Sequence, residues 1–211
     1  HAQGIVAGTI SVFLKKIFNI RNIISTHSIY NFPTSGFYNL FIKFVFKNCD
    51  HVLTLSNQSE LEILKLDIEQ SKISVFRYWV DQKVFRPISK TLSRKKLNLN
   101  SNDFICLYVG RLVEVKGVLE LLKASKKLKE KDFKVLIIGD GPLSKEVLRF
   151  EKINQNIIFR GKIDNSDLNL YYNASDVLIV PSTHEEGFGR VILESLSCGT
   201  PVIGSNRGAI P

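Results

Sequence analysis

The stretch that decides the fold runs from Pro181 to Gly204 and reads PSTHEEGFGRVILESLSCGTPVIG. An apolar run ends at Pro181, a Gly-Phe-Gly loop follows, and the apolar spacing after it predicts a helix that opens near Arg190. Glycines before a helix allow a ligand to approach the backbone closely, and the unpaired N–H groups of a first helical turn attract phosphate. The stretch therefore predicts a strand, a ligand loop and a helix in that order.

Two of the three carboxylates in this stretch are candidate ligand groups, Glu186 in the loop and Glu194 inside the predicted helix. A loop carboxylate can accept hydrogen bonds from sugar hydroxyls, and a carboxylate on the helix can accept both hydroxyls of a ribose. An ordinary strand–helix unit with a glycine-rich turn and solvated glutamates has the same pattern. The stretch by itself leaves both interpretations open.

Outward from this stretch, short apolar runs alternate with amphipathic segments along nearly the whole chain. The predicted strands are Asn22–Thr26, His51–Leu55, Ile73–Phe76, Phe104–Val109, Lys134–Ile138, Asn156–Phe159, Val177–Val180 and Pro201–Gly204. Strands that are apolar on both faces and are each followed by a helix indicate parallel sheets covered by helices. Ser56 is a predicted N-cap for a helix over Asn57–Leu66, and Asp164 or Ser166 for a helix over Asp167–Asn173.

The alternation breaks once, in a run rich in Ser, Lys and Asn between Arg86 and Asp103. We therefore predict a first domain over residues 1–87, a linker over 88–102 and a second α/β domain over 103–211. The chain opens on His-Ala-Gln-Gly and stops at Gly-Ala-Ile-Pro. We expect it to be a fragment of a longer protein, cut at both ends, with the C-terminal end of the second domain missing.

Composition narrows the class of protein. With 44% hydrophobic and 23% charged residues the chain has the balance of a globular protein rather than a disordered one. A net charge of +9 favours polyanionic partners such as nucleotides, anionic lipid headgroups or nucleic acid. The 3 cysteines lack C-x-x-C spacing, and no apolar run is long enough to span a bilayer, which favours a cytoplasmic protein.

Several segments together resemble one family. Glu186 and Glu194 in an E-x7-E pattern, followed by Cys-Gly-Thr-Pro-Val-Ile, resemble the donor-site signature of family-4 retaining glycosyltransferases of the GT-B fold. Other segments match that family in the same order: VDQKVFRP (80–87), LYVGRLVEVKG (107–117), VLIIGDGP (135–142), IIFRGKI (157–163) and LYYNASDVLIVPS (170–182). The resemblance covers essentially the whole chain from about residue 22. It implies two Rossmann-like α/β domains with parallel sheets, the N-terminal one incomplete.

The resemblance also implies the activity. The parent protein would be a hexosyltransferase of the EC 2.4 type that moves a sugar from a nucleotide diphosphate sugar to a hydroxyl acceptor with retention of configuration, without cofactor or metal. Its use would be in cell-envelope polysaccharide or glycolipid synthesis, with a glycan, a lipid-linked molecule or a small molecule as acceptor. The implied donor-binding residues are Gly110, Arg111, Lys116, Gly161, Lys162, Glu186, Gly187, Phe188, Gly189, Arg190, Val191 and Glu194. The implied catalytic residues are His27, Glu186, Arg111 and Lys116.

Arg111 and Lys116 have a clear physical role in such a reaction. A nucleotide diphosphate leaving group gains negative charge as the sugar–phosphate bond breaks, and fixed cations stabilise that charge most in the transition state. Without the resemblance, the Arg-x4-Lys spacing would be typical of surface cations that flank a helix. His27 follows a predicted strand where the family has a histidine facing the reacting sugar, although a histidine in a loop can also be a simple hydrogen-bonding residue.

One departure from the family concerns Tyr78-Trp79, which stands where the family usually has Asn-Gly. Because a bulky aromatic residue replaces a glycine that eases a turn, we expect the hinge or the acceptor side to differ from that of the family. The segment Phe37–Phe46, FYNLFIKFVF, is either a buried helix or an interfacial helix on the anionic inner face of the plasma membrane.

Other functions stay open. A non-catalytic protein that keeps the nucleotide-sugar cleft is one alternative, and a nucleotide-sugar epimerase or a glycosyl phosphorylase of similar fold is another. The latter two would need their own carboxylate pairs or a cofactor lysine, which the sequence does not show. Nucleic acid is not an expected partner, because no recognition motif accompanies the positive charge.

Overall fold

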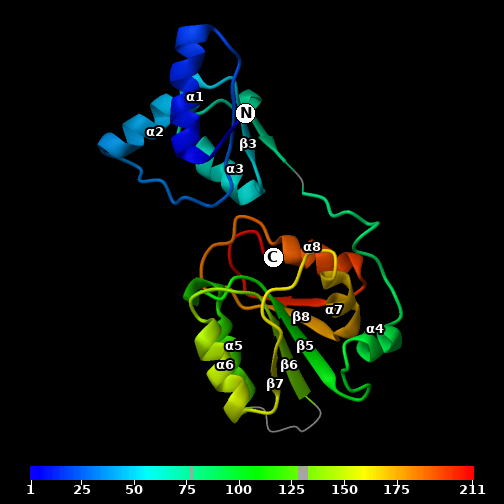
Figure 1. Cartoon of the computed structure of the whole chain (residues 1–211). Coiled ribbons are helices and arrows are strands. Elements are labelled where there is room, and N and C mark those ends of the chain that lie inside the picture. Colours follow the sequence, from blue (N-terminus) through cyan, green and yellow to red (C-terminus); the bar gives the residue numbers. More distant parts are fainter. Residues whose placement is uncertain (77, 128–132) are drawn as a thin grey trace. The chain divides into compact units, whose positions relative to one another are not determined.

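A computed structural model describes residues 1–76, 78–127 and 133–211. The chain divides into two compact units, one made of His1–Tyr78 with Glu185–Phe188 and the other of Trp79–His184 with Gly189–Pro211 (Figure 1). Each unit has its own parallel sheet and its own core. The predicted boundary at residue 87 lies later in the chain than this division, and the domain limits of the complete protein stay a prediction.

The first unit is built on a four-stranded parallel sheet in the order β1-β2-β3-β4. Its elements are β1 (Ala2–Gln3), α1 (Gly4–Phe18), β2 (Ile23–Ser25), α2 (Phe37–Asn48), β3 (His51–Thr54), α3 (Asn57–Leu64), η1 (Gln70–Lys72) and β4 (Ile73–Val75). The core joins strand residues such as Ile24 and Val52 to helix residues such as Val45 and Phe46. All strands run in the same direction, so the loops after β2 and β3 leave the same edge of the sheet.

The second unit carries a five-stranded parallel sheet in the order β7-β6-β5-β8-β9. Its elements are α4 (Lys90–Lys96), β5 (Phe104–Val109), η2 (Glu114–Lys116), α5 (Val118–Lys127), β6 (Phe133–Ile138), α6 (Ser144–Ile153), β7 (Ile157–Phe159), α7 (Leu168–Ala174), β8 (Val177–Val180), α8 (Arg190–Ser197) and β9 (Val202–Gly204). From β5 the chain builds outward to one side and then returns to the other at β8. In such sheets ligands bind at the carboxyl ends of the strands beside this reversal.

Helices cover both faces of the second sheet, with α5 and α6 on one side and α7 and α8 on the other (Figure 1). Alternate strand residues face the two layers. Leu107 and Leu136 pack with Tyr172 of α7, whereas Tyr108 and Val135 belong to the cluster that contains α5 and α6 residues. Because both faces of the sheet are buried, the sequences of its strands are continuous apolar runs.

The secondary structure agrees with most of the predicted elements. All eight predicted strands are present, with ends that differ by one residue or not at all, and Ser56 is the N-cap of α3, where its Oγ accepts the Ser59 N–H at 3.2 Å. The strand β1 was not predicted, because two residues are too few to show a pattern. The predicted caps of α7 were wrong, since Asp167 occupies that position without a side-chain capping bond. α3 also ends at Leu64, two residues before the predicted end.

The segment 88–102, predicted as a linker, contains the helix α4, which packs against α7. Arg94 carries this contact: it is 5% exposed, its Nε donates to the Ala174 carbonyl at 2.9 Å, and its Nη2 lies 2.7 Å from the Asp176 carboxylate. Lys90 pairs with the other oxygen of Asp176. The polar run is therefore a fixed part of the second unit.

Asp176→Asn tests this contact. The folded-state pKa of Asp176 lies below its usual value, because the Ile105 N–H and the two cations outweigh the opposing effect of burial. A depressed carboxyl pKa contributes stability that is present above the unfolded pKa of about 3.9 and is lost as the pH falls through the folded value. We expect urea unfolding at pH 7 to show a loss of about 3–5 kcal/mol, because Arg94 stays buried without its counter-charge.

The difference in the free energy of unfolding between wild type and Asp176→Asn should shrink once the pH is below the folded-state pKa of Asp176, because the side chain at position 176 is then neutral in both proteins. Glu146→Gln is a matched control, because Glu146 pairs with Arg149 on the exposed face of α6. It should change stability by less than about 1 kcal/mol. An equal loss for both variants at pH 7 would contradict the assigned contact.

Candidate functional site

A cavity of about 350 Å³ lies in the second unit at the carboxyl ends of β5 and β6. Its lining residues come from the loops that follow three neighbouring strands: Val109, Gly110, Arg111, Ile138, Gly139, Asp140, Lys162, Ile163 and Leu168. The cavity lies at the sheet edge where ligands of this architecture bind, close to the reversal of strand order. It brings together three of the predicted donor-binding residues, Gly110, Arg111 and Lys162.

Gly139 interlocks the loops around this cavity. Its φ of +146° is a conformation that favours glycine, and a Cβ atom at this position would lie 1.8 Å from the Gly110 carbonyl oxygen. The Gly139 N–H donates to the Gly161 carbonyl at 2.8 Å, and the Gly110 N–H donates to the Ile138 carbonyl at 3.1 Å. The three loops are therefore held together by their backbones, which leaves the neighbouring side chains available to a ligand.

Asp140, beside Gly139, is fixed by local hydrogen bonds. Its carboxylate accepts the Ser144 hydroxyl at 2.9 Å and the Gly141 N–H at 2.7 Å. These two bonds, of which the one from Ser144 is the stronger influence, hold the pKa of Asp140 below its ordinary value. Gly139 and Asp140 both line the cavity.

Arg111 and Lys116 both follow β5. Arg111 is exposed at the cavity, and Lys116 is half-buried in the short helix η2. Gly117 ends that helix with φ +71°, and a Cβ atom there would lie 1.9 Å from the Pro181 carbonyl oxygen. The loop that carries the two cations therefore packs directly on the end of β8.

Val115 fastens the same loop to the segment after β8. Its carbonyl oxygen accepts the Thr183 N–H at 3.0 Å and lies 2.9 Å from His184 Nδ1. This contact joins the Arg111–Lys116 loop to the stretch that leads into Glu186 and Glu194. Sequence reasoning missed it, because a backbone acceptor leaves no mark in the sequence.

Glu194 lies on α8 and is 3% exposed. Its two oxygens have separate partners: the Tyr172 hydroxyl donates to Oε2 at 2.8 Å, and Arg190 Nη2 lies 3.4 Å from Oε1. Burial, and then the negative charge of Glu194, raise the pKa of Tyr172. Tyr172 was not among the predicted site residues, since an aromatic residue in an amphipathic helix indicates core packing.

The remaining predicted residues lie elsewhere. His27 follows β2 in the first unit, where it is exposed and its Nε2 lies 2.9 Å from Ser25 Oγ. Glu186, Gly187 and Phe188 are grouped with the first unit, and the Glu186 residue is 7% exposed. Gly189, Arg190 and Val191 form the start of α8, where Gly189 supplies no side-chain cap to the first turn. None of these residues lines the 350 Å³ cavity.

Two wider properties bear on the site. In the part of the chain that the structure describes, no three His, Cys, Asp or Glu side chains gather as metal ligands would. No helix among residues 1–76, 78–127 and 133–211 has the length and hydropathy that crossing a membrane requires.

Comparison with known families gives a match over more than half of the chain. Residues 89–211 match the family model described as glycosyl transferases group 1. The N-acetyl-alpha-D-glucosaminyl L-malate synthase of Bacillus anthracis is 30% identical over 177 residues, which cover 82% of this chain and 46% of that protein. A putative teichuronic acid biosynthesis glycosyltransferase of Bacillus subtilis is 29% identical over 75% of this chain and 39% of its own. The chain thus spans less than half the length of these relatives.

Solved structures share the fold. Sucrose-phosphate synthase from Thermosynechococcus elongatus superposes with a TM-score of 0.83 at 26% identity, covering 99% of this chain and 56% of its own. Anabaena HepE in complex with UDP-glucose gives a TM-score of 0.80 at 20% identity, covering 96% and 58%. These likenesses confirm the predicted α/β fold class with two Rossmann-like units, and the family match confirms the resemblance that the sequence showed.

Proposed function

Because the chain belongs to the glycosyl transferases group 1 family, we propose that the complete protein moves a hexose from a nucleotide diphosphate sugar to a hydroxyl acceptor with retention of anomeric configuration. The observation that carries this proposal is the cavity at the carboxyl ends of β5 and β6, with Arg111 and Lys162 on its lining. Its volume of about 350 Å³ suits one nucleoside rather than a whole donor. The diphosphate and the sugar then extend beyond it.

The phosphate end of the donor binds at Arg111, Lys116 and the first turn of α8. Arg111 can form two parallel hydrogen bonds to phosphate oxygens, and Lys116 acts as a compact point charge. The first N–H groups of α8 have no side-chain cap and point outward along a helix dipole that favours anions. These fixed positive groups supply the charge stabilisation that a divalent ion would otherwise provide, which supports transfer without metal or cofactor.

The sugar end of the donor is assigned to the stretch around α8. Glu194 binds the ribose hydroxyls, because a carboxylate has about four acceptor positions and its bonds to Tyr172 and Arg190 occupy two of them. Glu186 accepts the hydroxyls of the hexose. His27 faces the reacting sugar, since it stands exposed at the carboxyl end of β2.

The names of two relatives support the proposed acceptor class. The named products of two of them are a glucosaminyl malate and teichuronic acid. We place this protein in the assembly of cell-envelope polysaccharide or glycolipid, with a hydroxyl of a glycan, a lipid-linked molecule or a small molecule as the acceptor. Synthesis from nucleotide sugars places it on the cytoplasmic side of the membrane.

Contact with the anionic inner face of the plasma membrane is supported by α2. Phe37 is 86% exposed and Leu40 66% exposed, and Lys43 and Lys47 lie on the same helix. Exposed apolar side chains can enter the headgroup region while the exposed Lys47 is drawn to anionic lipid, contributing about 1 kcal/mol near the surface. Lys43 pairs with Asp67 and adds little net charge to this face.

A vesicle assay tests the membrane contact. The chain should sediment with phosphatidylserine-containing vesicles and not with pure phosphatidylcholine, and Phe37→Ser/Leu40→Ser should lower the bound fraction at least fivefold. Leu148→Ser on α6 is the matched control, because Leu148 is exposed too but belongs to the second unit. Equal binding by all three forms would contradict a role for α2.

The function itself is tested with the complete protein and a panel of nucleotide diphosphate sugars. Incubation with each donor and a mixture of hydroxyl acceptors should release nucleoside diphosphate for at least one donor. Proton NMR of the product should show the same anomeric configuration as the donor, with full rate in the presence of EDTA. Tight binding of a nucleoside diphosphate with no turnover across the panel would instead indicate a binding protein, and inversion would overturn the retaining mechanism.

A further inference from the structure

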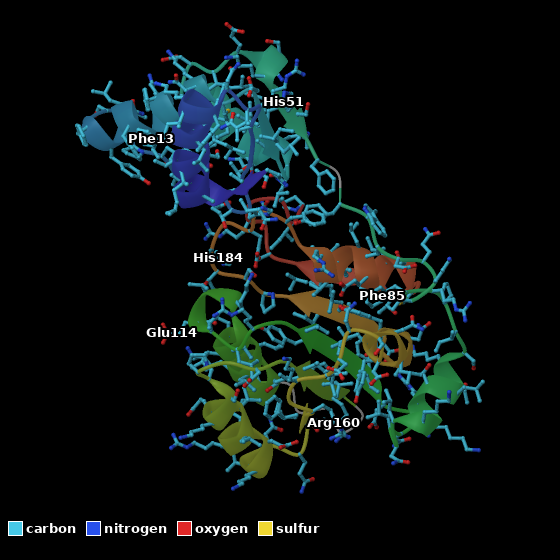
Figure 2. All side chains as sticks on the ribbon, turned by 45° about the horizontal axis from the view of Figure 1, so that its top comes forward. Phe13, His51, Phe85, Glu114, Arg160 and His184 are labelled. Carbon is cyan, nitrogen blue, oxygen red and sulfur yellow. The ribbon has the colours of Figure 1, made fainter. Side chains whose placement is uncertain are left out.

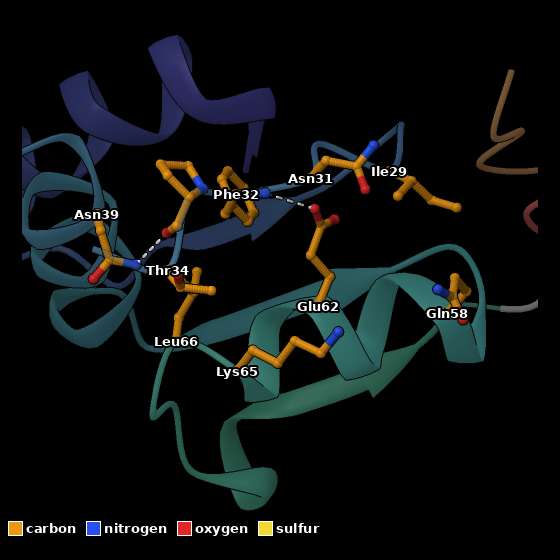
Figure 3. A pocket seen from close by; sticks show the side chains of 10 residues that line it. Ile29, Asn31, Phe32, Thr34, Asn39, Gln58, Glu62, Lys65 and Leu66 are labelled. Carbon is orange, nitrogen blue, oxygen red and sulfur yellow. Dashed lines mark hydrogen bonds between the residues drawn. The ribbon is translucent and has the colours of Figure 1, made fainter. Parts of the chain in front are cut away.

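A second cavity, of about 200 Å³, lies wholly within the first unit (Figure 3). It is bounded by the segment 29–34, which follows β2, and by the helix α3, which follows β3. Its lining residues are Ile29, Asn31, Phe32, Pro33, Thr34, Asn39, Gln58, Glu62, Lys65 and Leu66. Since β2 and β3 are parallel neighbours, both walls come from the carboxyl edge of the sheet, where ligands of α/β folds bind.

The wall formed by the segment 29–34 is fixed by side chains from two helices. Glu62 of α3 accepts the Tyr30 N–H at 2.9 Å and the Phe32 N–H at 3.1 Å, one on each carboxylate oxygen. Asn39 of α2 donates to the Pro33 carbonyl at 2.6 Å, and the rings of Tyr30 and Phe32 stack at 5.2 Å. The cavity is thus formed before any ligand arrives, so that binding does not have to order the loop.

The lining is suited to a hydroxylated ligand. Asn31, Thr34 and Gln58 are exposed and supply amide and hydroxyl groups that both donate and accept hydrogen bonds. The half-buried Phe32 ring and the half-buried Ile29 side chain provide apolar surface for the carbon faces of a ring. The volume is smaller than the roughly 300–1,000 Å³ of sites for drug-sized ligands, which limits the occupant to about one sugar ring.

Lys65 adds a positive charge to this lining. Its side chain extends along α3 in the direction of Gln58 (Figure 3), and among the described residues it has no ion-pair partner. The only carboxylate of the lining, Glu62, already accepts two backbone N–H groups, which disperse its charge. The ammonium of Lys65 is therefore the group that remains available for an anion.

We propose that this cavity binds a small hydroxylated molecule with one anionic group, a carboxylate or a phosphate, and that Lys65 pairs with the anion. The hydroxyls of the ligand bind Asn31, Thr34 and Gln58. Because His27 belongs to the same loop after β2, we assign this ligand as the acceptor of the transferred sugar. That assignment rests on the proposed function, whereas binding by the cavity does not.

The experiment titrates the 211-residue chain with glucose, glucuronate and glucose 6-phosphate at 0.15 M salt, followed by NMR shift changes. These probes share a ring and differ in the anionic group, so they separate a carboxylate from a phosphate. We expect at least one of the two anions to bind at least tenfold more tightly than glucose. Lys65→Ala should lower the affinity for that anion to the affinity for glucose. Gln58→Ala should lower the affinity for every probe that binds.

Lys16→Ala is the matched control, because Lys16 is an exposed lysine of the same unit that does not line the cavity. It should leave every affinity unchanged. Equal affinity for the three probes, no binding of any of them at 20 mM, or an unchanged affinity in Lys65→Ala would overturn the proposal.

Binding of UDP, ADP and GDP by the same samples separates the two claims. Binding of one of these diphosphates without sugar-acid binding overturns the cavity proposal alone. Sugar-acid binding in a protein that binds no nucleoside diphosphate supports the cavity, overturns the proposed function, and removes the assignment of the ligand as acceptor.

Discussion

Replacing both Arg111 and Lys116 with alanine is expected to lower kcat/KM of the complete protein for its donor by at least about 10²–10³-fold, the scale measured when one fixed donor to a developing oxyanion is removed. The loss should fall mainly on kcat, because the phosphate gains charge as the bond to the sugar breaks. Steady-state rates over a range of donor concentrations measure both constants.

Arg149→Ala/Lys152→Ala is the control for this prediction. Both residues are exposed on α6 and do not line the 350 Å³ cavity. Their replacement removes two positive charges, as the Arg111→Ala/Lys116→Ala variant does. This variant should keep its rate within about twofold, since no effect beyond general charge is expected. If both double variants lose rate equally, overall charge rather than a phosphate clamp accounts for donor use.

Gly139→Ala is expected to have a large effect on both the stability and the nucleotide binding of the second unit. The added methyl would lie 1.8 Å from the Gly110 carbonyl, at a φ of +146°. The backbones of three loops would have to separate, so we expect a loss of more than about 3 kcal/mol in the free energy of unfolding, together with loss of nucleotide binding.

Gly199→Ala separates strain from collision. Gly199 also has a positive φ, +79°, but a Cβ atom there would meet nothing within 4 Å. Gly199→Ala should therefore lower the free energy of unfolding by only about 1–2 kcal/mol, through backbone strain. Urea unfolding of the two variants measures the difference, and similar losses would contradict the interlocked loops around the cavity.

Much of the fold could be predicted because its strands are buried on both faces. Phe104–Val109 and Val177–Val180 have the predicted bounds, since continuous apolar runs of this kind are typical of parallel sheets. The helix α4 could not be predicted from its polar sequence. Arg94 holds it in place through Asp176, and the two residues are 82 positions apart.

The candidate site also contains some residues that the sequence predicted and others that it did not. Gly110 and Arg111 were predicted from local patterns, and both line the cavity. Ile163 and Leu168 also line it, and Tyr172 binds Glu194, but these three residues look like ordinary core positions in the sequence. Only the chain path brings them to the strand ends. The 200 Å³ cavity was likewise not predicted, because its walls meet across two loops.

The side-chain view shows how the labelled residues of the second unit are distributed (Figure 2). His184 lies on the segment after β8, and Glu114 lies on the loop after β5. The carbonyl oxygen of Val115, next to Glu114, connects this loop to the segment that carries His184. Arg160 follows β7, and its N–H donates to the Ile137 carbonyl at 3.0 Å. The carboxyl edge of the sheet therefore brings together loops that follow β5, β7 and β8, in addition to the loop after β6 that lines the cavity.

The most direct test of a donor site in the second unit is calorimetric titration of the 211-residue chain with UDP, ADP, GDP and the matching monophosphates. We predict one-to-one binding of at least one diphosphate with a Kd below about 100 μM, at least tenfold tighter than its monophosphate, because Arg111 and Lys116 bind the second phosphate. Arg111→Ala/Lys116→Ala should remove that difference. Absence of binding by all three diphosphates at 1 mM, or equal affinity for diphosphate and monophosphate, would contradict the assignment.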